Sequence, residues 1–349
     1  MSHRRFLAIY AALFLSGIAA VAGFNWWMDP LWCFSHGHRF NQRQFGFDER
    51  QQKINRIEFG TFDYDAILLG SSRSTYIDQH DFPGSKVFNL AVSGMRPDEY
   101  GAYLDLARRR LGKDLPTVFI GIDFFGTNRN YGGRANPAAQ YMATAEAPLY
   151  RFEALVGLEL LGKSAENFEA RNGECDCYDR ENVKHMVMPP ERDKAAVLAK
   201  DLAAYREHIY GSDYAYDTEL PTIWRELRQR NPRTRFVVFT TPTSQPLFLL
   251  LARSGRLPDL ERWLRQAVAE FGAVHDFMGI NPVTANLDNY QDGGHFTPAV
   301  GRLLAQKVSG TEVAPKDFGV LVTADNLERH LADLRRQAVA ADGLEEARR

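Results

Sequence analysis

The sequence is poor in cysteine and has no excess of charge of either sign. Only three cysteines, Cys33, Cys175 and Cys177, occur in 349 residues, which excludes a dense disulfide framework and leaves room for one bridge. Lys and Arg number 42 and Asp and Glu 44, so the net charge is -2, and no long block of one sign occurs. This balance removes the electrostatic basis for nucleic-acid binding. We therefore expect small molecules or neutral polymers as partners.

The sequence also lacks the patterns of common cofactor and metal sites. The polar stretch after the first apolar run, GSSRST, matches neither phosphate-binding pattern, G-x-x-x-x-G-K-[ST] or G-x-G-x-x-G. Cys175 and Cys177 with the later His185 form too small a set for a zinc site, and we expect the cysteines to lie in loops. No cofactor and no metal is expected.

The N-terminus carries the longest apolar run. A basic leader, a run of nineteen uncharged and mostly apolar residues, and a tryptophan cluster follow one another: His3 to Arg5, Phe6 to Phe24, and Trp26, Trp27 and Trp32. A helix of this length spans a bilayer, the tryptophans suit an aromatic belt, and the positive-inside bias keeps the leader cytoplasmic. We therefore expect a single-pass anchor at residues 1–25 in an inner membrane, with the rest of the chain in the periplasm or outside the cell.

A cleaved signal peptide is the alternative to this anchor. Ala20-Val21-Ala22 resembles a signal-peptide cleavage site. The apolar run is nevertheless longer than the usual signal-peptide core of about 7 to 15 residues. Its length favours the anchor.

Short apolar runs recur along the rest of the chain, separated by helical patterns. The runs span residues 66–70, 86–90, 117–123, 235–241 and 273–277, and the clearest helical patterns span 48–59, 97–111 and 257–271. Near-continuous apolar strands that alternate with amphipathic helices are typical of a parallel sheet covered on both faces. The sequence therefore predicts an α/β fold, a three-layer sandwich with a mostly parallel sheet.

The alternation breaks between about residues 124 and 232, where helical spacing continues without a clear strand. We expect a mostly helical insertion there, of the kind that shapes a ligand crevice at the carboxyl ends of parallel strands. The expected organisation is the anchor at 1–25, a linker and leading helix at 26–59, an α/β domain at 60–320 that contains the insertion, and an amphipathic helix with a tail at 321–349.

The stretch DYDAILLGSSRSTYID, residues 63–78, ends an apolar run in Gly70-Ser71-Ser72. Taken alone, this turn favours a helix-capping serine, and Ser74 suits that role. A second segment, DGGH at 292–295, changes the interpretation. A serine nucleophile needs an imidazole base and a carboxylate that orients the imidazole, and Asp292 and His295 provide both from one turn.

These residues resemble the SGNH/GDSL hydrolase superfamily in order, spacing and strand context across residues 60 to 308. The matching blocks are GSS after the first strand, FNLAVSGMRPDEY after the second, IGIDFF after the third, and the late DGGH. The resemblance implies the SGNH form of a flavodoxin-like fold. It also implies that Ser72 is the nucleophile, His295 the general base, and Asp292 its orienting carboxylate.

The resemblance further implies an oxyanion hole, from which this sequence departs at one position. The family uses the N–H of the nucleophile, the N–H of a block-two glycine and a block-three asparagine, and Ser72 and Gly94 match the first two. Asp123 stands where the asparagine is expected. An ionised carboxylate there would repel an oxyanion, so Asp123 is protonated, pairs with Arg73, or faces elsewhere. The alternative donors are Asn89 and Asn128.

A narrower resemblance joins the anchor, GSSRS, DGGHFTPAVG and DFGVLVTADNLERHL. Together they are similar to membrane-anchored extracytoplasmic SGNH-like proteins of alginate O-acetylation and teichoic acid D-alanylation. This implies a serine esterase or O-acyltransferase that acts on acyl esters, most simply acetyl esters, of an envelope or secreted polysaccharide. A membrane-bound acyltransferase is a candidate partner.

Two other functions stay open. The first is a catalytically weak or inactive SGNH-fold scaffold of a polysaccharide modification complex, which Asp123 favours. The second is a lipid-active esterase, which closeness to the membrane favours. The remaining polar residues are expected to be structural, and five histidines are expected to be solvated: His36, His38, His80, His208 and His330.

Overall fold

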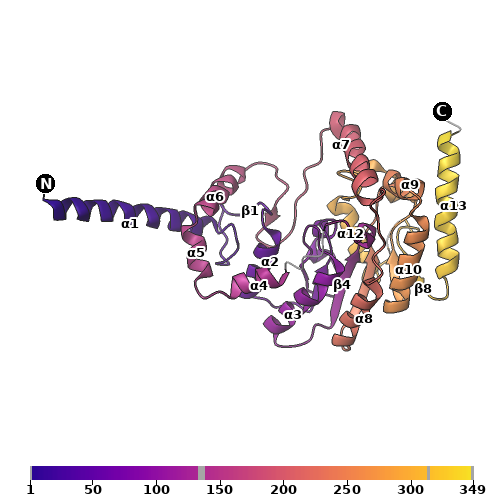
Figure 1. The fold of residues 1–349 in the computed structure, drawn as a ribbon, viewed down its shortest axis with the longest axis horizontal. Coiled ribbons are helices and arrows are strands. Elements are labelled where there is room, and N and C mark those ends of the chain that lie inside the picture. The colour runs from indigo at the N-terminus through magenta and orange to yellow at the C-terminus, as the bar shows by residue number, and fades with distance from the viewer. Residues whose placement is uncertain (1, 133–137, 313–314, 347–349) are drawn as a thin grey trace. The chain divides into compact units, whose positions relative to one another are not determined.

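The computed structural model describes residues 2–132, 138–312 and 315–346 (Figure 1). The chain forms two compact units, one made of residues 1–62 and 137–185, the other of residues 63–136 and 186–349. The segment expected as a single helical insertion, 124–232, is mostly helical but does not form one block. Its middle part belongs to the N-terminal unit, and its two ends belong to the α/β unit.

A six-stranded sheet lies at the centre of the α/β unit, in the order β3-β2-β4-β6-β7-β8. The strands are β2 (Ala66–Leu69), β3 (Val87–Asn89), β4 (Thr117–Ile122), β6 (Arg235–Thr240), β7 (Ala273–Asp276) and β8 (Val320–Thr323). All neighbours pair in parallel except β7 and β8, which are antiparallel. In chain order the parallel strands follow 2-1-3-4-5, a common order of doubly wound sheets. The predicted α/β class with a mostly parallel sheet is confirmed.

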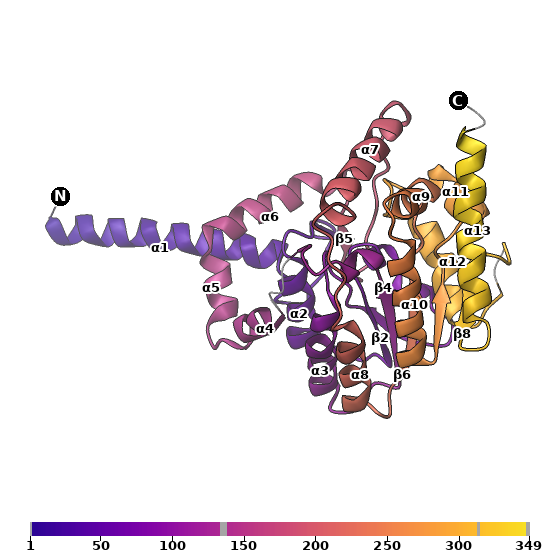
Figure 2. The same ribbon diagram turned by 45° about the vertical axis from the view of Figure 1, so that its right-hand side comes forward.

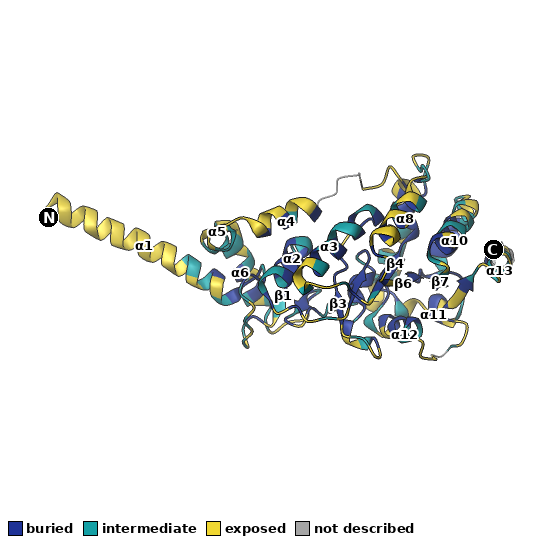
Figure 3. Cartoon of the chain, turned by 90° about the horizontal axis from the view of Figure 1, so that it is seen from below, coloured by how far each residue is buried: buried dark blue, intermediate teal, exposed yellow. Residues whose placement is uncertain are grey.

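Helices cover both faces of this sheet, as Figure 3 shows from below. One face carries α3 (Tyr100–Leu111), α8 (Leu220–Arg230) and α10 (Leu257–Phe271), and the other carries α11 (Pro282–Ala285) and α12 (Pro298–Val308). On the α12 face, Leu68, Phe119 and Leu304 belong to one buried apolar cluster. Successive side chains of a strand point to opposite faces, so short runs of buried apolar residues supply both layers.

The C-terminal helix α13 (Leu327–Glu346) is joined to the sheet by a buried polar contact. His330 Nε2 lies 2.6 Å from Asp276 Oδ2 at the end of β7, and Thr240 donates a hydrogen bond of 2.6 Å to the other oxygen of Asp276. The expectation that His330 is solvated is therefore wrong. His330 faces the carboxylate of Asp276, and the two residues come together only when α13 packs on the folded sheet. The expected C-terminal segment also contains β8, a strand that the sequence did not predict.

The other helices of the α/β unit include one that continues into a π-helical turn. They are α7 (Glu191–Ala204), continued by a π-helical turn at Tyr205–Ile209, and α9 (Gln245–Arg253). Short 3-10 turns, including η1 (Ser74–Tyr76), η3 (Pro97–Glu99) and η4 (Phe124–Thr127), follow strands β2, β3 and β4. A π-helical turn like the one at Tyr205–Ile209 is frequent at functional sites.

The N-terminal unit is built around the C-terminal end of α1 (His3–Met28). Its other elements are α2 (Glu49–Phe59), α4 (Ala138–Glu146), α5 (Tyr150–Val156), α6 (Leu158–Ala170) and a two-stranded ribbon of β1 (Arg43–Gln44) and β5 (Tyr178–Asp179). Helix α2 begins as predicted, because the Asp48 carboxylate accepts a hydrogen bond from the Gln51 N–H at 3.2 Å. Among the described residues, α1 is the one helix long and apolar enough to cross a membrane, and its apolar window is fully exposed.

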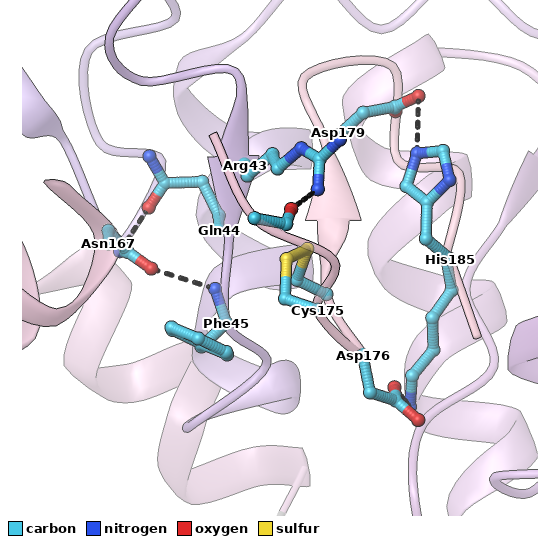
Figure 4. Close-up of a disulfide and its surroundings, with 11 residues drawn as sticks. Arg43, Gln44, Phe45, Asn167, Cys175, Asp176, Asp179 and His185 are labelled. Atoms are coloured by element: carbon cyan, nitrogen blue, oxygen red, sulfur yellow. Dashed lines mark hydrogen bonds and ion pairs between the residues drawn. A yellow bond between two sulfur atoms is a disulfide. The ribbon is translucent and has the colours of Figure 1, made fainter. Parts of the chain in front are cut away.

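The ribbon of β1 and β5 lies beside a disulfide between Cys175 and Cys177 (Figure 4). The side chain of Arg43 donates to the carbonyl of Gly173 in the same loop, and His185 pairs with Asp179 at 3.5 Å. The two cysteines lie in a loop as expected, and their bond to each other removes them as zinc ligands. Cys33 is free and buried.

Candidate active site

Ser72 lies at the carboxyl end of β2, in a turn that is shaped by two glycines. A Cβ atom on Gly70, or on Gly121 of the neighbouring strand β4, would overlap the Ser74 hydroxyl. Glycine at both positions therefore lets the turn pack against β4. The prediction that Ser74 caps a helix is wrong. Its hydroxyl is enclosed between the two strands and has no hydrogen-bond partner in the described part of the chain.

The turn before α12 presents Asp292 and His295. One carboxylate oxygen of Asp292 accepts hydrogen bonds from the backbone N–H groups of Gly294 and His295, both at 2.7 Å. The N–H of Gln291 donates to the His295 carbonyl at 2.9 Å and closes the turn. A carboxylate that accepts two backbone N–H groups is fixed in direction, which leaves its second oxygen for the imidazole.

The structure brings together the three residues that the sequence proposes as a triad. Ser72 Oγ lies 2.8 Å from His295 Nε2, although the two residues are 223 positions apart. His295 Nδ1 lies 2.7 Å from Asp292 Oδ2. Each contact is within the range expected of a nucleophile, its base and the group that orients the base.

The electrostatics of Asp292 suit the orienting role. Burial by itself would raise the pKa of this carboxyl, but the hydrogen bonds from His295 and Gly294 outweigh it and lower the pKa from 3.8 to about 2. Asp292 is therefore ionised at neutral pH and accepts a hydrogen bond from the Nδ1–H group of His295. This leaves Nε2 as the proton acceptor that faces Ser72.

A pocket of about 230 Å³ opens at Ser72 and His295. Its lining residues are Ser72, Arg73, Gly94, Phe125, Tyr131, Asp201, Ala204, Tyr205, His208, Ile209 and His295. Gly94 has a φ of 66°, a left-handed conformation that favours glycine. Among the described residues, the structure gives no hydrogen-bond partner for the backbone N–H of Ser72 or of Gly94. Both N–H groups are therefore free to bind a ligand oxygen.

Asp123 pairs with Arg73, which is one of the three arrangements expected from the sequence. Arg73 Nη1 lies 3.3 Å from Asp123 Oδ1, and both side chains are almost fully buried. The Thr241 hydroxyl also donates to Asp123. Arg73, but not Asp123, lines the pocket. The carboxylate is thus neutralised by its neighbours and does not face the ligand space.

Arg73 itself is held as a cation from several sides. Its Nη2 donates to the Tyr205 hydroxyl at 2.5 Å. Burial opposes the charge of the guanidinium, but Tyr205 and Asp123 raise the pKa of Arg73 above its ordinary value. A permanent positive charge therefore lines the pocket at which Ser72 lies.

The two alternative oxyanion donors are used elsewhere. The Asn89 side-chain amide donates to the carbonyls of Ser74 and Ile77 at 2.9 and 2.8 Å. The Asn128 amide donates to the carbonyl of Ile209 at 2.9 Å. Both side chains are buried and absent from the pocket lining, so neither replaces the missing asparagine.

The sequence predicted that the segment 124–232 would shape a ligand crevice, but it did not show which residues of α7 and its π-helical turn line the pocket. Asp201, Tyr205 and His208 all line the pocket, and His208 was expected to be only a solvated residue. Asp201 accepts a hydrogen bond of 3.0 Å from the Gly293 N–H in the Asp292 turn. Asp201, Tyr205 and His208 are spaced by four and three positions, as residues on one face of a helix are. The sequence does not indicate that this face meets the site.

Comparison of the chain with family models, with curated proteins and with solved structures gives no match. The chemistry of the site is therefore judged from its geometry.

Proposed function

We propose that this protein is an SGNH-type serine esterase or O-acyltransferase that acts outside the cytoplasm on acyl esters, most simply acetyl esters, of a polysaccharide. The observation that carries the proposal is the unbroken chain of contacts from Ser72 Oγ to His295 and from His295 to Asp292, at 2.8 and 2.7 Å. Residues predicted from two separate segments, Ser72 from one and Asp292 with His295 from the other, meet at the edge of the sheet where doubly wound folds bind ligands.

The proposed reaction proceeds through an acyl-enzyme. Ser72 Oγ attacks the ester carbonyl while His295 Nε2 takes the hydroxyl proton, and Asp292 stabilises the imidazolium that forms. The Ser72 and Gly94 N–H groups accommodate the oxyanion. His295 then returns the proton to the leaving alcohol. Water or a sugar hydroxyl attacks the acyl-enzyme, with His295 as base again, and releases Ser72.

The size of the pocket supports a small acyl group. Its volume of about 230 Å³ is below the roughly 300 to 1,000 Å³ of sites that enclose drug-sized ligands. An acetyl group needs little of this space, whereas a long acyl chain would have to extend out of it. The pocket therefore favours the polysaccharide esterase over the lipid-active esterase.

The proposed location rests on α1 and on the disulfide. We propose that α1 crosses the membrane once, with the basic residues Arg4 and Arg5 in the cytoplasm and the remaining chain in the periplasm or outside the cell. The disulfide between Cys175 and Cys177 supports this, because disulfides persist in oxidising compartments and are rare in the cytosol.

The second candidate is a non-catalytic scaffold, and Asp123 is the residue that favours it. With Asp123 paired to Arg73 and with Asn89 and Asn128 used elsewhere, the N–H groups of Ser72 and Gly94 are available to an oxyanion, but none of these three side chains supplies the third donor. Loss of one such donor commonly slows catalysis by about 10²- to 10³-fold. A slow enzyme and an inactive scaffold are therefore the two outcomes to separate.

A series of synthetic esters of increasing chain length tests the proposal with the full-length protein in detergent. We expect hydrolysis of acetyl esters that falls with chain length, is abolished in Ser72→Ala and is retained in Ser93→Ala, a serine outside the triad. Equal rates of hydrolysis for the wild type and Ser72→Ala would contradict the proposal that Ser72 catalyses ester hydrolysis. A preference for long chains would support the lipid-active esterase instead. Adding an oligosaccharide acceptor and measuring its acetylation distinguishes transfer from hydrolysis.

A further inference from the structure

The N-terminal unit carries a stripe of exposed apolar side chains on α5 and at its two ends, with Leu149 as the residue before the helix. Leu149, Phe152 and Val156 are 60, 66 and 49% exposed, and Leu158 at the start of α6 is 74% exposed. Positions i, i+3 and i+7 lie on one side of a helix, so the first three side chains share a face. Large apolar residues gathered in this way on a short exposed helix indicate a surface that something covers.

The stripe is tied to the end of α1 through Asn25. The Asn25 amide donates to the carbonyls of Leu155 and Gly157 at 2.9 and 3.2 Å, and the Ser164 hydroxyl donates to its oxygen at 2.9 Å. Asn25 is 1% exposed. The junction between α5 and α6 is therefore fixed against the last turns of α1.

The position along α1 matches the edge of a bilayer. The described residues of α1 are exposed up to Ala20, and most residues from Val21 to Met28 are partly or fully buried, with Gly23 and Trp26 exposed. The nineteen apolar residues Phe6 to Phe24 span roughly 28 Å as a helix, close to the thickness of the hydrocarbon core. Trp26 and Trp27 follow directly, as interfacial tryptophans do.

The direction of α5 relative to α1 also fits a bilayer surface. In Figures 1 and 2, α5 runs across the end of α1. If α1 crosses the membrane, a helix that runs across the end of α1 lies along the membrane plane. The exposed carboxylates of Glu153 and Glu159 beside the stripe exclude deep insertion and suit the headgroup region.

We propose that α5 and the start of α6 form an interfacial membrane-contact surface, with Leu149, Phe152, Val156 and Leu158 inserted among the lipids of the outer leaflet. This inference rests on the proposed membrane crossing of α1. A second copy of the chain fits this surface less well. A standard stable interface buries about 800 Å² of surface on each partner, and four side chains expose much less area than this.

Spin labels on the full-length protein in phosphatidylcholine vesicles test this surface. Cys33, the free native cysteine, is first replaced as Cys33→Ser, and Phe152→Cys or Val156→Cys is then introduced and labelled with a nitroxide. The accessibility of each label to oxygen is compared with its accessibility to a water-soluble nickel complex. The matched control is Val339→Cys, an exposed apolar position (72%) on α13 in the α/β unit. Leu13→Cys, in the middle of α1 and 69% exposed, reports on the membrane crossing itself.

We expect the ratio of oxygen to nickel accessibility at Phe152 and Val156 to exceed the ratio at Val339 several-fold, with Leu13 higher still. Water-like ratios at Phe152 and Val156 with a lipid-like ratio at Leu13 would overturn the contact surface and leave the membrane crossing intact. A water-like ratio at Leu13 would overturn both. Dipolar broadening between labels at Phe152, persisting at low protein-to-lipid ratio, would replace the lipid contact by a dimer. None of these readouts depends on esterase activity.

Discussion

At the scale of single residues, the ion pair between Arg73 and Asp123 bears most directly on the proposed reaction. Arg73 follows Ser72, the proposed nucleophile, directly in the chain, and Asp123 follows β4. In the proposed reaction, this pairing balances the charge of the buried carboxylate, so that it does not repel the oxyanion. It also makes each partner dependent on the other, because a lone buried charge is costly.

Removal of Asp123 should destabilise the protein strongly. In Asp123→Ala the Arg73 charge stays buried without its partner, and we expect a loss of about 3 to 5 kcal/mol in the free energy of unfolding. Chemical unfolding in detergent measures this. The control is Asp63→Ala, whose pair with Lys86 is exposed to solvent, and which should leave the free energy of unfolding almost unchanged. Equal effects of the two changes would contradict the buried pair.

The depressed pKa of Asp292 predicts a specific pH dependence. A carboxyl whose pKa falls from 3.8 to about 2 on folding binds fewer protons in the folded state. The stability that it contributes is therefore fully present above pH 4 and is lost as the pH falls toward 2. The difference in unfolding free energy between the wild type and Asp292→Asn should shrink over this window. A difference that is constant from neutral pH to pH 2 would show that Asp292 is not held as an anion.

At the scale of elements, Lys53 makes α2 sensitive to pH. It is fully buried, and its ammonium lies 4.8 Å from the ring centre of Tyr178 on β5. Burial lowers the pKa of Lys53 to about 7, with Glu49 opposing the change. Between pH 7 and the ordinary pKa of 10.5 the unfolded state binds more protons, so stability rises with pH.

Replacement of Lys53 should stabilise the protein more at low pH than at high pH. Lys53→Met removes the cost of burying the ammonium, so its thermal midpoint should exceed the wild-type value more at pH 6 than at pH 10. Thermal unfolding in detergent at the two pH values measures the difference. A gain that is equal at both values would mean that Lys53 keeps its ordinary pKa.

The contact between α1 and the α5–α6 junction gives a second prediction at this scale. Asn25→Leu removes the donor to the carbonyls of Leu155 and Gly157, and an unsatisfied buried polar group costs about 1 to 3 kcal/mol. Hydrogen exchange should therefore become faster in the amides of α5 and α6. The amides of β4 in the α/β unit serve as the internal reference. Unchanged exchange in α5 and α6 would show that Asn25 does not hold them.

The sequence was most informative about elements with a strong apolar pattern. The strands β2, β3, β4, β6 and β7 were found because each lies in a short apolar run, and the amphipathic helix α10 was predicted with its observed bounds, Leu257–Phe271. Strand β8 was missed because it is an antiparallel edge strand with Val320 and Leu321 exposed by 37 and 48%. Its burial pattern is not that of a central parallel strand.

At the scale of the whole molecule, long-range packing explains what the sequence left open. The return of residues 137–185 to the N-terminal unit depends on contacts such as Asn167 with Gln44 and Arg180 with Asp29, which are more than 120 positions apart. The triad was predictable because Ser72, Asp292 and His295 belong to short local motifs. Asp201, Tyr205 and His208 were not, because only the folded insertion brings their helix to the pocket.

The most direct test of the account is covalent labelling of the full-length protein in detergent with a fluorophosphonate probe, followed by mass mapping of the modified peptide. We predict one adduct on Ser72 in the wild type and in Ser93→Ala, no adduct in Ser72→Ala, and much slower labelling in His295→Ala, because the imidazole activates the hydroxyl. A folded wild-type protein that forms no adduct, or that is labelled at a different serine, would contradict the assignment of Ser72 as a nucleophile.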